Sequence, residues 1–332
     1  FQPGPELLRE RGGTTGSAGM RLITFDAGHG SRPGVHLDEA SILDLDAALA
    51  RAPIGQAPFG SLHELIGRGA AALDATRRLL QIAARGELDA AKVPHAKARV
   101  LAPIPRPAKN VFCVGRNYAE HIAEGARAQR IALDLPEFPV FFSKPPTAVI
   151  GPGEAIPVQP AVSTKIDYEV ELAVVIGKRG SNIKAGQALD HVFGYTIVND
   201  VTARDLQRRH GGQFLKGKGL DGSCPMGPAI VTRDAIADPG QLAIRLWVNG
   251  ELRQDGNTRD MIFPIAELIE SLSEGITLEP GDLLATGTPS GVGYAMSEPQ
   301  FHKDGDVVIC EIEGIGRLVN PVTEVGAAPR VA

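Results

Sequence analysis

Residues 166–177, with the sequence IDYEVELAVVIG, constrain the fold of this chain more than any other stretch. The β-branched and aliphatic residues, closed by a glycine, predict a β-strand. Successive side chains of a strand point to opposite faces, so Glu169 and Glu171 share one face of this strand. The other face is apolar and predicts a core position, and it carries Tyr168, Val170, Leu172, Val174 and Ile176.

Two carboxylates side by side on a hydrophobic strand require an explanation. Like charges repel, and burial makes the charged state more costly. The pair is therefore solvated, protonated or bound to a cation, and an isolated E-x-E pattern is most often a solvated strand end. The pattern alone leaves all three open.

Composition excludes several classes of function. The chain has 332 residues, 43% of them hydrophobic, and a net charge of −5, which predicts one large domain or two modest ones. No run approaches the ~18 apolar residues of a membrane span, so we expect no membrane partner. The mildly acidic balance without a basic cluster argues against a nucleic-acid partner. Abundant glycine and proline with 5% aromatic residues favour a turn-rich β protein over a helix bundle.

The three cysteines, Cys113, Cys224 and Cys310, lie far apart in the sequence. No CxxC motif is present, which argues against a thiolate zinc site. Their odd number favours a reducing, cytoplasmic location. Apolar or small neighbours indicate that each cysteine is a buried packing residue.

The order of patterns along the chain divides it into segments. Residues 1–19 are polar and glycine-rich, and we interpret them as a leader or disordered extension. Residues 20–100 combine strand patterns with helical patterns at 61–68 and 72–85, which predicts a small α/β domain. Residues 101–110 form a proline-rich linker. Residues 111–325 consist mainly of strand patterns, so a doubly wound fold is disfavoured.

A histidine and a glutamate follow the first strand of this larger domain. Asn117 is expected to cap a helix, with Glu120 completing a capping box. On that helix His121 and Glu124 are three residues apart and therefore neighbours. A carboxylate that orients an imidazole suits a general base. The alternative is a solvated pair on an exposed helix.

Two further residues bear charges at places where a site often forms. Asp200 ends the apolar strand pattern 192–200 and is either a helix cap or a third carboxylate, with Thr202 also able to cap the helix 203–210. Lys218 lies in the glycine-dense segment 211–227, which lacks the P-loop order. We expect either a lysine that a flexible loop carries to an anionic substrate or a solvated loop lysine.

An ordered set of short motifs, none of them specific alone, resembles the fumarylacetoacetate hydrolase (FAH) superfamily over residues 108–321. The set comprises Gly115-Arg116-Asn117-Tyr118 with His121 and Glu124, Ser143-Lys144-Pro145, Glu169-Val170-Glu171, Asn199-Asp200-Val201-Thr202-Ala203-Arg204-Asp205, Lys218 before Ser223-Cys224-Pro225, and Thr286-Gly287-Thr288-Pro289.

The resemblance implies an α+β, β-rich fold: an FAH-type mixed β-sandwich roll with a small N-terminal α/β domain, assembled as a homodimer. It also implies a Mg²⁺ or Mn²⁺ ion held by Glu169, Glu171 and Asp200. This agrees with the preference of hard divalent ions for carboxylate oxygens.

The resemblance further implies roles for individual side chains. His121 and Glu124 match the catalytic dyad of a lid helix, which the loop at residues 134–139 is expected to make mobile. Lys218 matches an active-site lysine. The side chains that match substrate-contacting positions are Arg116, Lys144, Gln207 and Thr288.

The spacing G-R-N-Y-x-x-H-x-x-E is closer to acylpyruvases, fumarylpyruvate hydrolases, oxaloacetate decarboxylases and isomerases than to fumarylacetoacetase itself. Our first hypothesis is a metal-dependent hydrolase that cleaves a C–C bond of a 2,4-dioxo acid of the acylpyruvate or fumarylpyruvate type and releases pyruvate as its enolate. The alternative is an oxaloacetate decarboxylase, or an isomerase, hydratase or lyase acting on a 2-oxo dicarboxylic acid. The alternative outside enzymes is a metal-stabilised binding domain.

Overall fold

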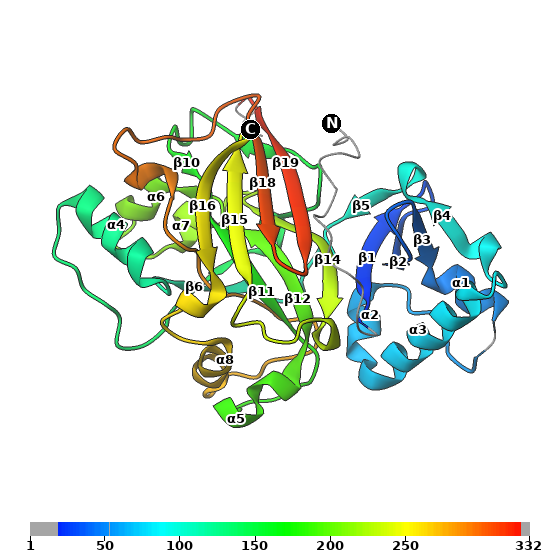
Figure 1. Cartoon of the computed structure of the whole chain (residues 1–332). Coiled ribbons are helices and arrows are strands. Elements are labelled where there is room, and N and C mark those ends of the chain that lie inside the picture. The colour runs from blue at the N-terminus through cyan, green and yellow to red at the C-terminus, as the bar shows by residue number, and fades with distance from the viewer. Residues whose placement is uncertain (1–18, 53, 327–332) are drawn as a thin grey trace, which may run out of the picture.

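A twelve-stranded sheet connects the N-terminal part of the chain to the rest (Figure 1). The structure is a computed structural model that describes residues 19–52 and 54–326. Nearly all of the predicted leader, residues 1–19, lies outside these ranges. None of the helices in the described ranges is long and apolar enough to cross a membrane.

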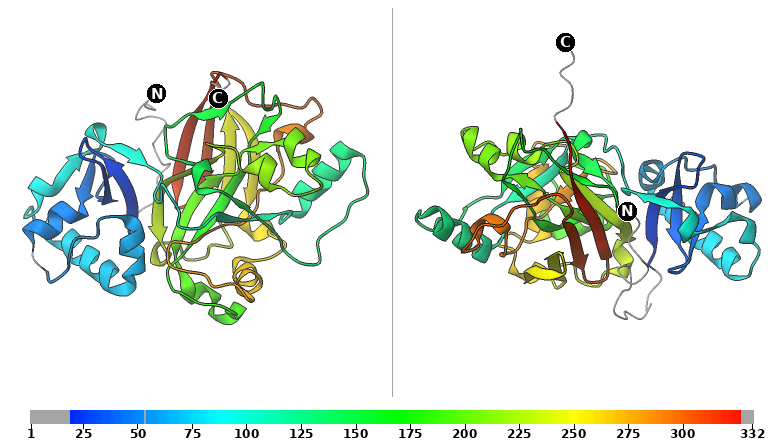
Figure 2. Two further views of the ribbon diagram at one scale, coloured as in Figure 1. Left: turned by 180° about the vertical axis from the view of Figure 1, so that it is seen from behind. Right: turned by 90° about the horizontal axis from the view of Figure 1, so that it is seen from above.

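The N-terminal elements form one end of this sheet, with helices packed against them. They are β1 (Arg21–Asp26), β2 (Ser31–His36), β3 (Ser41–Asp44), α1 (Leu45–Arg51), α2 (Leu62–Gly67), α3 (Gly69–Ala84), β4 (Lys92–Pro94) and β5 (Arg99–Leu101). The sequence did not predict α1, which begins because the Asp44 carboxylate accepts a hydrogen bond from the Ala47 amide. Figure 2 shows these elements lying to one side of the larger part.

The expected domain boundary is bridged by strand pairing. β1 pairs with β14 (Cys224–Thr232) at Arg21–Val231 and Leu22–Ile230. One hydrophobic cluster also contains residues of α3 together with Ala173 from the central strand. The N-terminal part therefore shares sheet and core with the larger part.

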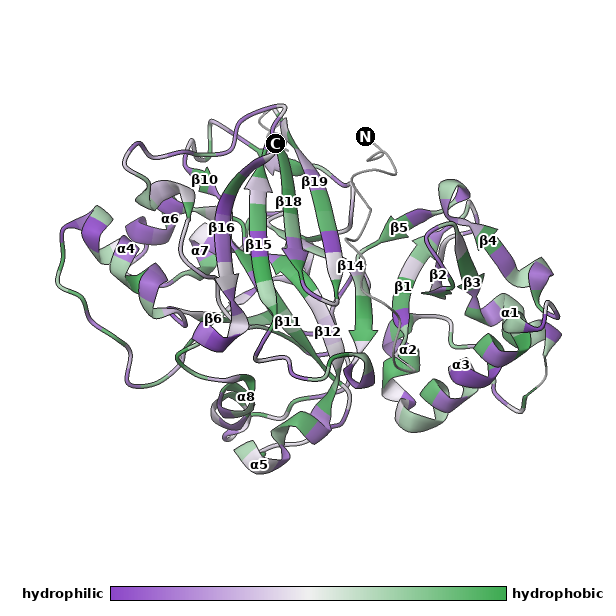
Figure 3. Ribbon diagram, viewed as in Figure 1, coloured by the Kyte–Doolittle hydropathy of each residue, from purple (hydrophilic) through white to green (hydrophobic). Residues whose placement is uncertain are grey.

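The larger part is a sandwich of two sheets. In the first, β11 (Val170–Ile176) lies between β12 (Val192–Asn199) and β17 (Leu283–Ala285). The second consists of β16 (Glu251–Asn257), β15 (Ala243–Val248), β18 (Val307–Ile312), β19 (Gly316–Glu324) and β9 (Ile156–Val158). Apolar side chains of both sheets meet between them, and Figure 3 shows the hydrophobic strands involved. The predicted β-rich α+β sandwich is confirmed.

The central segment 166–177 was predicted as one strand, and this prediction is wrong in one detail. It consists of β10 (Ile166–Asp167) and β11, separated by Tyr168 and Glu169. The Asp167 carboxylate accepts a hydrogen bond from the Tyr168 amide, and the Asn199 side chain accepts one from the Glu169 amide. These amides bond to side chains instead of a neighbouring strand, so the strand is interrupted. Both faces of β11 are buried.

The first sheet continues beyond β17 through β6 (Val111–Gly115) and β7 (Val140–Lys144), and β8 (Val149–Ile150) pairs with β14. The other elements lie outside the two sheets. They are α4 (Ala119–Gln129), α5 (Ala185–Ala188), β13 (Thr202–Ala203), α6 (Arg204–Arg209), α7 (Leu215–Lys218) and α8 (Ile265–Ser273). Asn249 and Gly250 form the tight turn between β15 and β16, and both residues have positive φ, 53° and 81°. All three cysteines are buried and free, as predicted.

Candidate functional site

Three carboxylates converge at the interruption between β10 and β11. Glu171 lies in β11, Glu169 directly precedes it, and Asp200 follows β12. Antiparallel pairing of the two strands places Asp200 beside Glu169, whose carbonyl accepts a hydrogen bond of 2.8 Å from the Asp200 amide. One oxygen from each carboxylate lies within 4.8 Å of the others. The sequence-predicted trio therefore forms a buried cluster.

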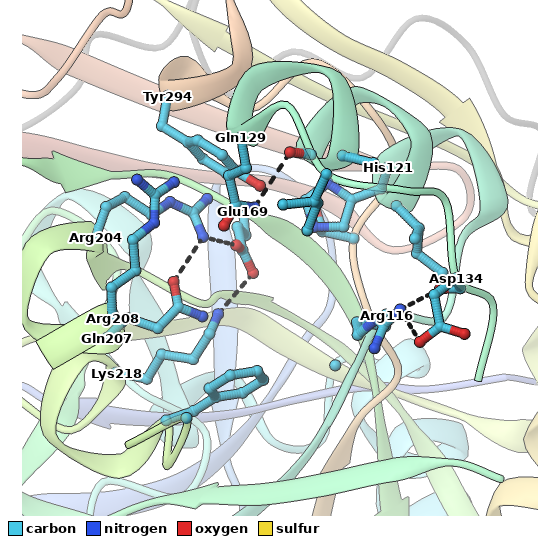
Figure 4. Close-up of a pocket in the computed structure, with 18 of the residues that line it drawn as sticks. Arg116, His121, Gln129, Asp134, Glu169, Arg204, Gln207, Arg208, Lys218 and Tyr294 are labelled. Carbon is cyan, nitrogen blue, oxygen red and sulfur yellow. Dashed lines mark hydrogen bonds and ion pairs between the residues drawn. The ribbon is translucent and has the colours of Figure 1, made fainter. Parts of the chain in front are cut away.

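Two buried cations contact Glu169 of this cluster (Figure 4). The Lys218 ammonium lies 2.8 Å from a Glu169 oxygen and 2.5 Å from an Asp200 oxygen. The Arg204 guanidinium bridges Glu169 at 2.7 Å and Asp167 at 2.8 Å. Their side chains are 4% exposed, so solvent screens these pairs little.

A third cation lies behind the cluster. The Lys144 ammonium contacts an Asp200 oxygen at 2.6 Å and also donates to the carbonyls of Val201 and Lys218. Lys144 is fully buried, and the cavity that holds the cluster is lined by other residues. Its position supports Asp200, and the substrate contact that the resemblance implies for Lys144 stays a prediction.

The charges of the cluster do not balance. Four carboxylates, those of Asp167, Glu169, Glu171 and Asp200, face three cations, which leaves one negative charge. Burial would raise the pKa of Glu169, but Lys218 and Arg204 outweigh it and hold that pKa below its usual range. Burial is the main cause that raises the pKa of Glu171 well above its usual range, and the negative charges of Asp200 and Glu169 raise it further.

The donor set fits a hard divalent cation. Three carboxylate oxygens close enough to share an ion, one of them poorly compensated, match the ligands that Mg²⁺ and Mn²⁺ prefer. Glu169 and Glu171 border a cavity, so water or substrate has access to the remaining coordination positions. Glu169, Glu171 and Asp200 are thus able to hold one metal ion.

The histidine–glutamate pair lies on α4 at the same cavity. His121 Nδ1 is 2.9 Å from Glu124 Oε1. The other Glu124 oxygen accepts a hydrogen bond of 2.8 Å from the Gly291 amide, so the carboxylate is fixed from two sides. The pair is largely buried, which argues against the solvated alternative.

The predicted capping by Asn117 is wrong. Tyr118 precedes α4 and makes no side-chain cap. The Asn117 amide instead accepts from the Phe263 amide at 2.8 Å and donates to the Thr286 carbonyl at 2.8 Å. Asn117 therefore ties the start of α4 to the loop after β17, a long-range role that local spacing does not reveal.

The structure also differs from the predictions for Thr202 and Lys218. Thr202 does not cap α6; its hydroxyl donates to the Asp200 carbonyl and accepts from the Lys218 ammonium at 2.9 Å. Lys218 lies at the end of the short helix α7 and is buried, whereas a flexible, exposed loop was expected.

One cavity of about 350 Å³ brings the site residues together. Glu169 and Glu171 of the cluster line it together with Lys218 and with His121 of α4, and Arg116, Gln207 and Thr288 line it as well. Thr288 also donates to the Val170 carbonyl and accepts from Gln254, so its hydroxyl is already engaged.

Sequence reasoning missed three functional residues of this cavity, Arg204, Arg208 and Tyr294. Arg204 was noted within a motif without a role, yet it is 3% exposed and holds Glu169. Tyr294 lies under Arg204 and Arg208, whose guanidinium carbons are 4.4 and 5.1 Å from the centre of its ring. The absence of a side chain at Gly125 lets α4 approach the Tyr294 hydroxyl. The sequence feature that could have indicated a role for Arg204 is its position four residues after Asp200.

Comparison with known proteins identifies the family. The profile described as "Fumarylacetoacetate (FAA) hydrolase C-terminal" matches residues 110–323. Oxaloacetate tautomerase YisK of Bacillus subtilis is 46% identical over 306 residues, which cover 91% of this chain and all of YisK. The mitochondrial oxaloacetate tautomerase FAHD2B of Bos taurus is 43% identical over 310 residues, 92% of each chain.

A solved structure agrees with these relatives. The fumarylacetoacetate hydrolase from Exiguobacterium antarcticum superimposes with a TM-score of 0.73 at 39% identity, covering 92% of this chain and all of that one. The chain therefore belongs to the fumarylacetoacetate hydrolase family of enzymes.

Proposed function

We propose that this enzyme interconverts the keto and enol forms of oxaloacetate, or of a closely related 2-oxo dicarboxylic acid, with the help of Mg²⁺ or Mn²⁺. The observation that carries the proposal is the position of His121, held by Glu124, at the same cavity as the three-carboxylate cluster. An oriented base beside a metal-binding cluster suits proton removal next to a carbonyl group.

The charged side chains of the cavity suit a dicarboxylate. The bound ion would supply Lewis-acid polarisation of the 2-oxo group. Arg116 and Arg208 line the cavity apart from the cluster and offer guanidinium donors to the second carboxylate. Lys218 and Arg204 hold Glu169 in place.

The proton transfer itself balances without another reactant. His121 accepts a proton from C3 of the substrate as a C2=C3 double bond forms, and it then returns that proton to the C2 oxygen, which gives the enol and restores the neutral imidazole. Glu124 fixes the imidazole so that Nδ1 faces the carboxylate and Nε2 is the atom that exchanges protons. The reverse sequence restores the keto form.

Hydrolysis of an acylpyruvate, the first hypothesis from the sequence, additionally requires water attack at a distal carbonyl. The relatives named as tautomerases support the alternative, an isomerase acting on a 2-oxo dicarboxylic acid, better than hydrolysis. Decarboxylation of oxaloacetate belongs to the same alternative and uses the same cluster. The three reactions differ in product, so one set of assays separates them.

The test follows enol absorbance of oxaloacetate in the ultraviolet, with enzyme treated with EDTA and then resupplied with Mg²⁺. We expect metal-dependent loss of enol absorbance that His121→Ala abolishes and the exposed-histidine control His29→Ala leaves intact. Release of pyruvate from acetylpyruvate or of CO₂ from oxaloacetate, at a rate exceeding tautomerisation, would replace this proposal with hydrolysis or decarboxylation.

A further inference from the structure

A second cavity of about 380 Å³ lies apart from the candidate active site. It is bounded by β15, β16 and the loop before β18, drawn in orange at the top of Figure 1. None of the residues that line it also lines the first cavity. The lining includes Thr164, Tyr168, Val248, Arg253, Phe301 and His302.

Three polar side chains of this cavity lack hydrogen-bond partners among the described residues. They are Tyr168 at its hydroxyl, Arg253 at Nε and His302 at both ring nitrogens. Tyr168 is 2% exposed and His302 is 7% exposed, so their polar atoms have little contact with bulk solvent. Buried polar groups in folded proteins are almost always paired, which points to a missing partner inside the cavity.

The neighbouring acid does not serve as that partner. His302 Nδ1 lies 3.8 Å from Asp306, too far for a hydrogen bond. The Asp306 oxygens instead accept from the Asn249 side chain at 2.9 Å and from the Lys303 amide at 3.0 Å. The His302 backbone amide donates to the Ile166 carbonyl at 2.8 Å, which fixes the ring beside Tyr168.

The unpaired atoms indicate the chemistry of the ligand. Arginine Nε is only a donor, the tyrosine hydroxyl donates, and an imidazole donates from at least one nitrogen. A group with several acceptor oxygens satisfies all three. Arg253 and Lys303 bring two positive charges, which Glu251, paired with Arg253 at 3.0 Å, and Asp306 offset. This balance favours a carboxylate with one charge over a doubly charged phosphate.

Part of the wall is apolar, where Val248, Pro299 and Phe301 line the cavity. The remaining lining residues are polar or charged: Thr164, Asn249, Gln300, Lys303 and Asp306. A cavity of this size, with an apolar stretch and a few convergent donors, is typical of small-molecule sites. We propose that this cavity binds a small organic monocarboxylate, with its carboxylate held by Tyr168, Arg253 and His302 and its carbon chain against the apolar stretch.

Butyrate is a suitable probe because it carries one carboxylate and lacks a 2-oxo group for the metal cluster. Trp247, the one tryptophan of the chain, adjoins Val248 in β15 and provides a fluorescence signal beside calorimetry. We expect saturable binding of one butyrate per chain to the full-length protein.

Two variants and two matched controls locate that binding. Tyr168→Phe and Arg253→Leu should each raise the Kd at least about ten-fold, the effect of one lost hydrogen bond to a charged group. Tyr195→Phe, another buried tyrosine, and Arg245→Leu, on the neighbouring strand and paired with Asp255, should leave the Kd unchanged. Tyr168→Phe removes only the hydroxyl and keeps the aromatic ring. If Arg253→Leu fails to fold, the Kd of Tyr168→Phe alone tests the proposal.

Four results would overturn the proposal. The first is the absence of saturable butyrate binding, and the second is an equal increase of the Kd in the control variants. The third is tighter binding of inorganic phosphate than of butyrate. The fourth is loss of butyrate binding in the active-site variant Arg116→Leu while Arg253→Leu still binds it. A crystal structure determined with butyrate that shows only water in this cavity would also overturn the proposal.

Discussion

Replacement of Lys144 by methionine tests how the buried cations support the carboxylate cluster. The Lys144 ammonium is fully buried and contacts an Asp200 oxygen at 2.6 Å, together with the carbonyls of Val201 and Lys218. Methionine fills a similar volume but donates no hydrogen bond. The substitution therefore leaves three buried acceptors without this donor.

The expected loss of stability is large. Removal of one partner of a buried ion pair costs about 3–5 kcal/mol, because the remaining charge stays buried. Lys218 still contacts the other Asp200 oxygen at 2.5 Å, so the lower half of that range is expected. Since domains unfold with only about 5–15 kcal/mol, this loss is a substantial fraction of total stability.

The assay is urea unfolding of metal-free protein, repeated with Mg²⁺. Lys184→Met is the matched control, since its ammonium pairs with Glu270 at 3.1 Å on the surface and is 77% exposed. We expect no measurable change in that control. Mg²⁺ should stabilise Lys144→Met by about 2.7 kcal/mol at 100 times its Kd, since the ion binds only the folded chain. Equal unfolding midpoints of Lys144→Met and Lys184→Met would refute the reasoning.

Three further predictions concern other side chains. His121→Ala should slow tautomerisation by about 10²–10⁴-fold while calorimetry shows unchanged Mg²⁺ affinity, and full activity would exclude His121 as the base. Glu171→Gln should remove one ligand and abolish stabilisation by Mg²⁺ in thermal melts; undiminished stabilisation would exclude Glu171 as a ligand. Burial, and to a smaller extent the charge of His95, lowers the pKa of His36 from 6.5 to about 4. Between these pH values the unfolded chain binds a proton at His36 that the folded chain does not bind. The free energy of unfolding should therefore fall as the pH drops from 6.5 to 4. His36→Gln should lose this part of the acid sensitivity in urea melts at pH 7 and 5, and an unchanged difference between the two pH values would contradict the assignment.

The parts of the site that sequence reasoning located follow from the period of a strand. Alternation placed Glu169 and Glu171 on one face, and the end of the next strand pattern placed Asp200 at a junction. The i, i+3 spacing paired His121 with Glu124 in the same way, and the structure gives a contact of 2.9 Å. These relationships are local, so they are readable without knowledge of the fold.

The parts that were missed depend on contacts between distant segments. Asn117 forms hydrogen bonds with residues 146 and 169 positions away in the sequence. Its side chain is therefore engaged in tertiary contacts and does not cap α4. Arg204 received no role from the sequence, because burial of a cation depends on acids that another segment supplies. The interruption of the central strand likewise depends on the Asn199 side chain.

The charge of the buried cluster links the metal to the substrate. Four carboxylates against three cations leave one negative charge, and the raised pKa of Glu171 identifies the carboxylate that is least compensated. One divalent ion reverses this imbalance to a single positive charge. A carboxylate of a 2-oxo acid then neutralises that charge inside a cavity where electrostatic interactions are strong. Ion and anionic substrate should therefore each increase the affinity of the site for the other, as linkage requires. A neutral carbonyl compound lacks this mutual gain, which accounts for the preference for 2-oxo acids that the proposed function assigns to this site.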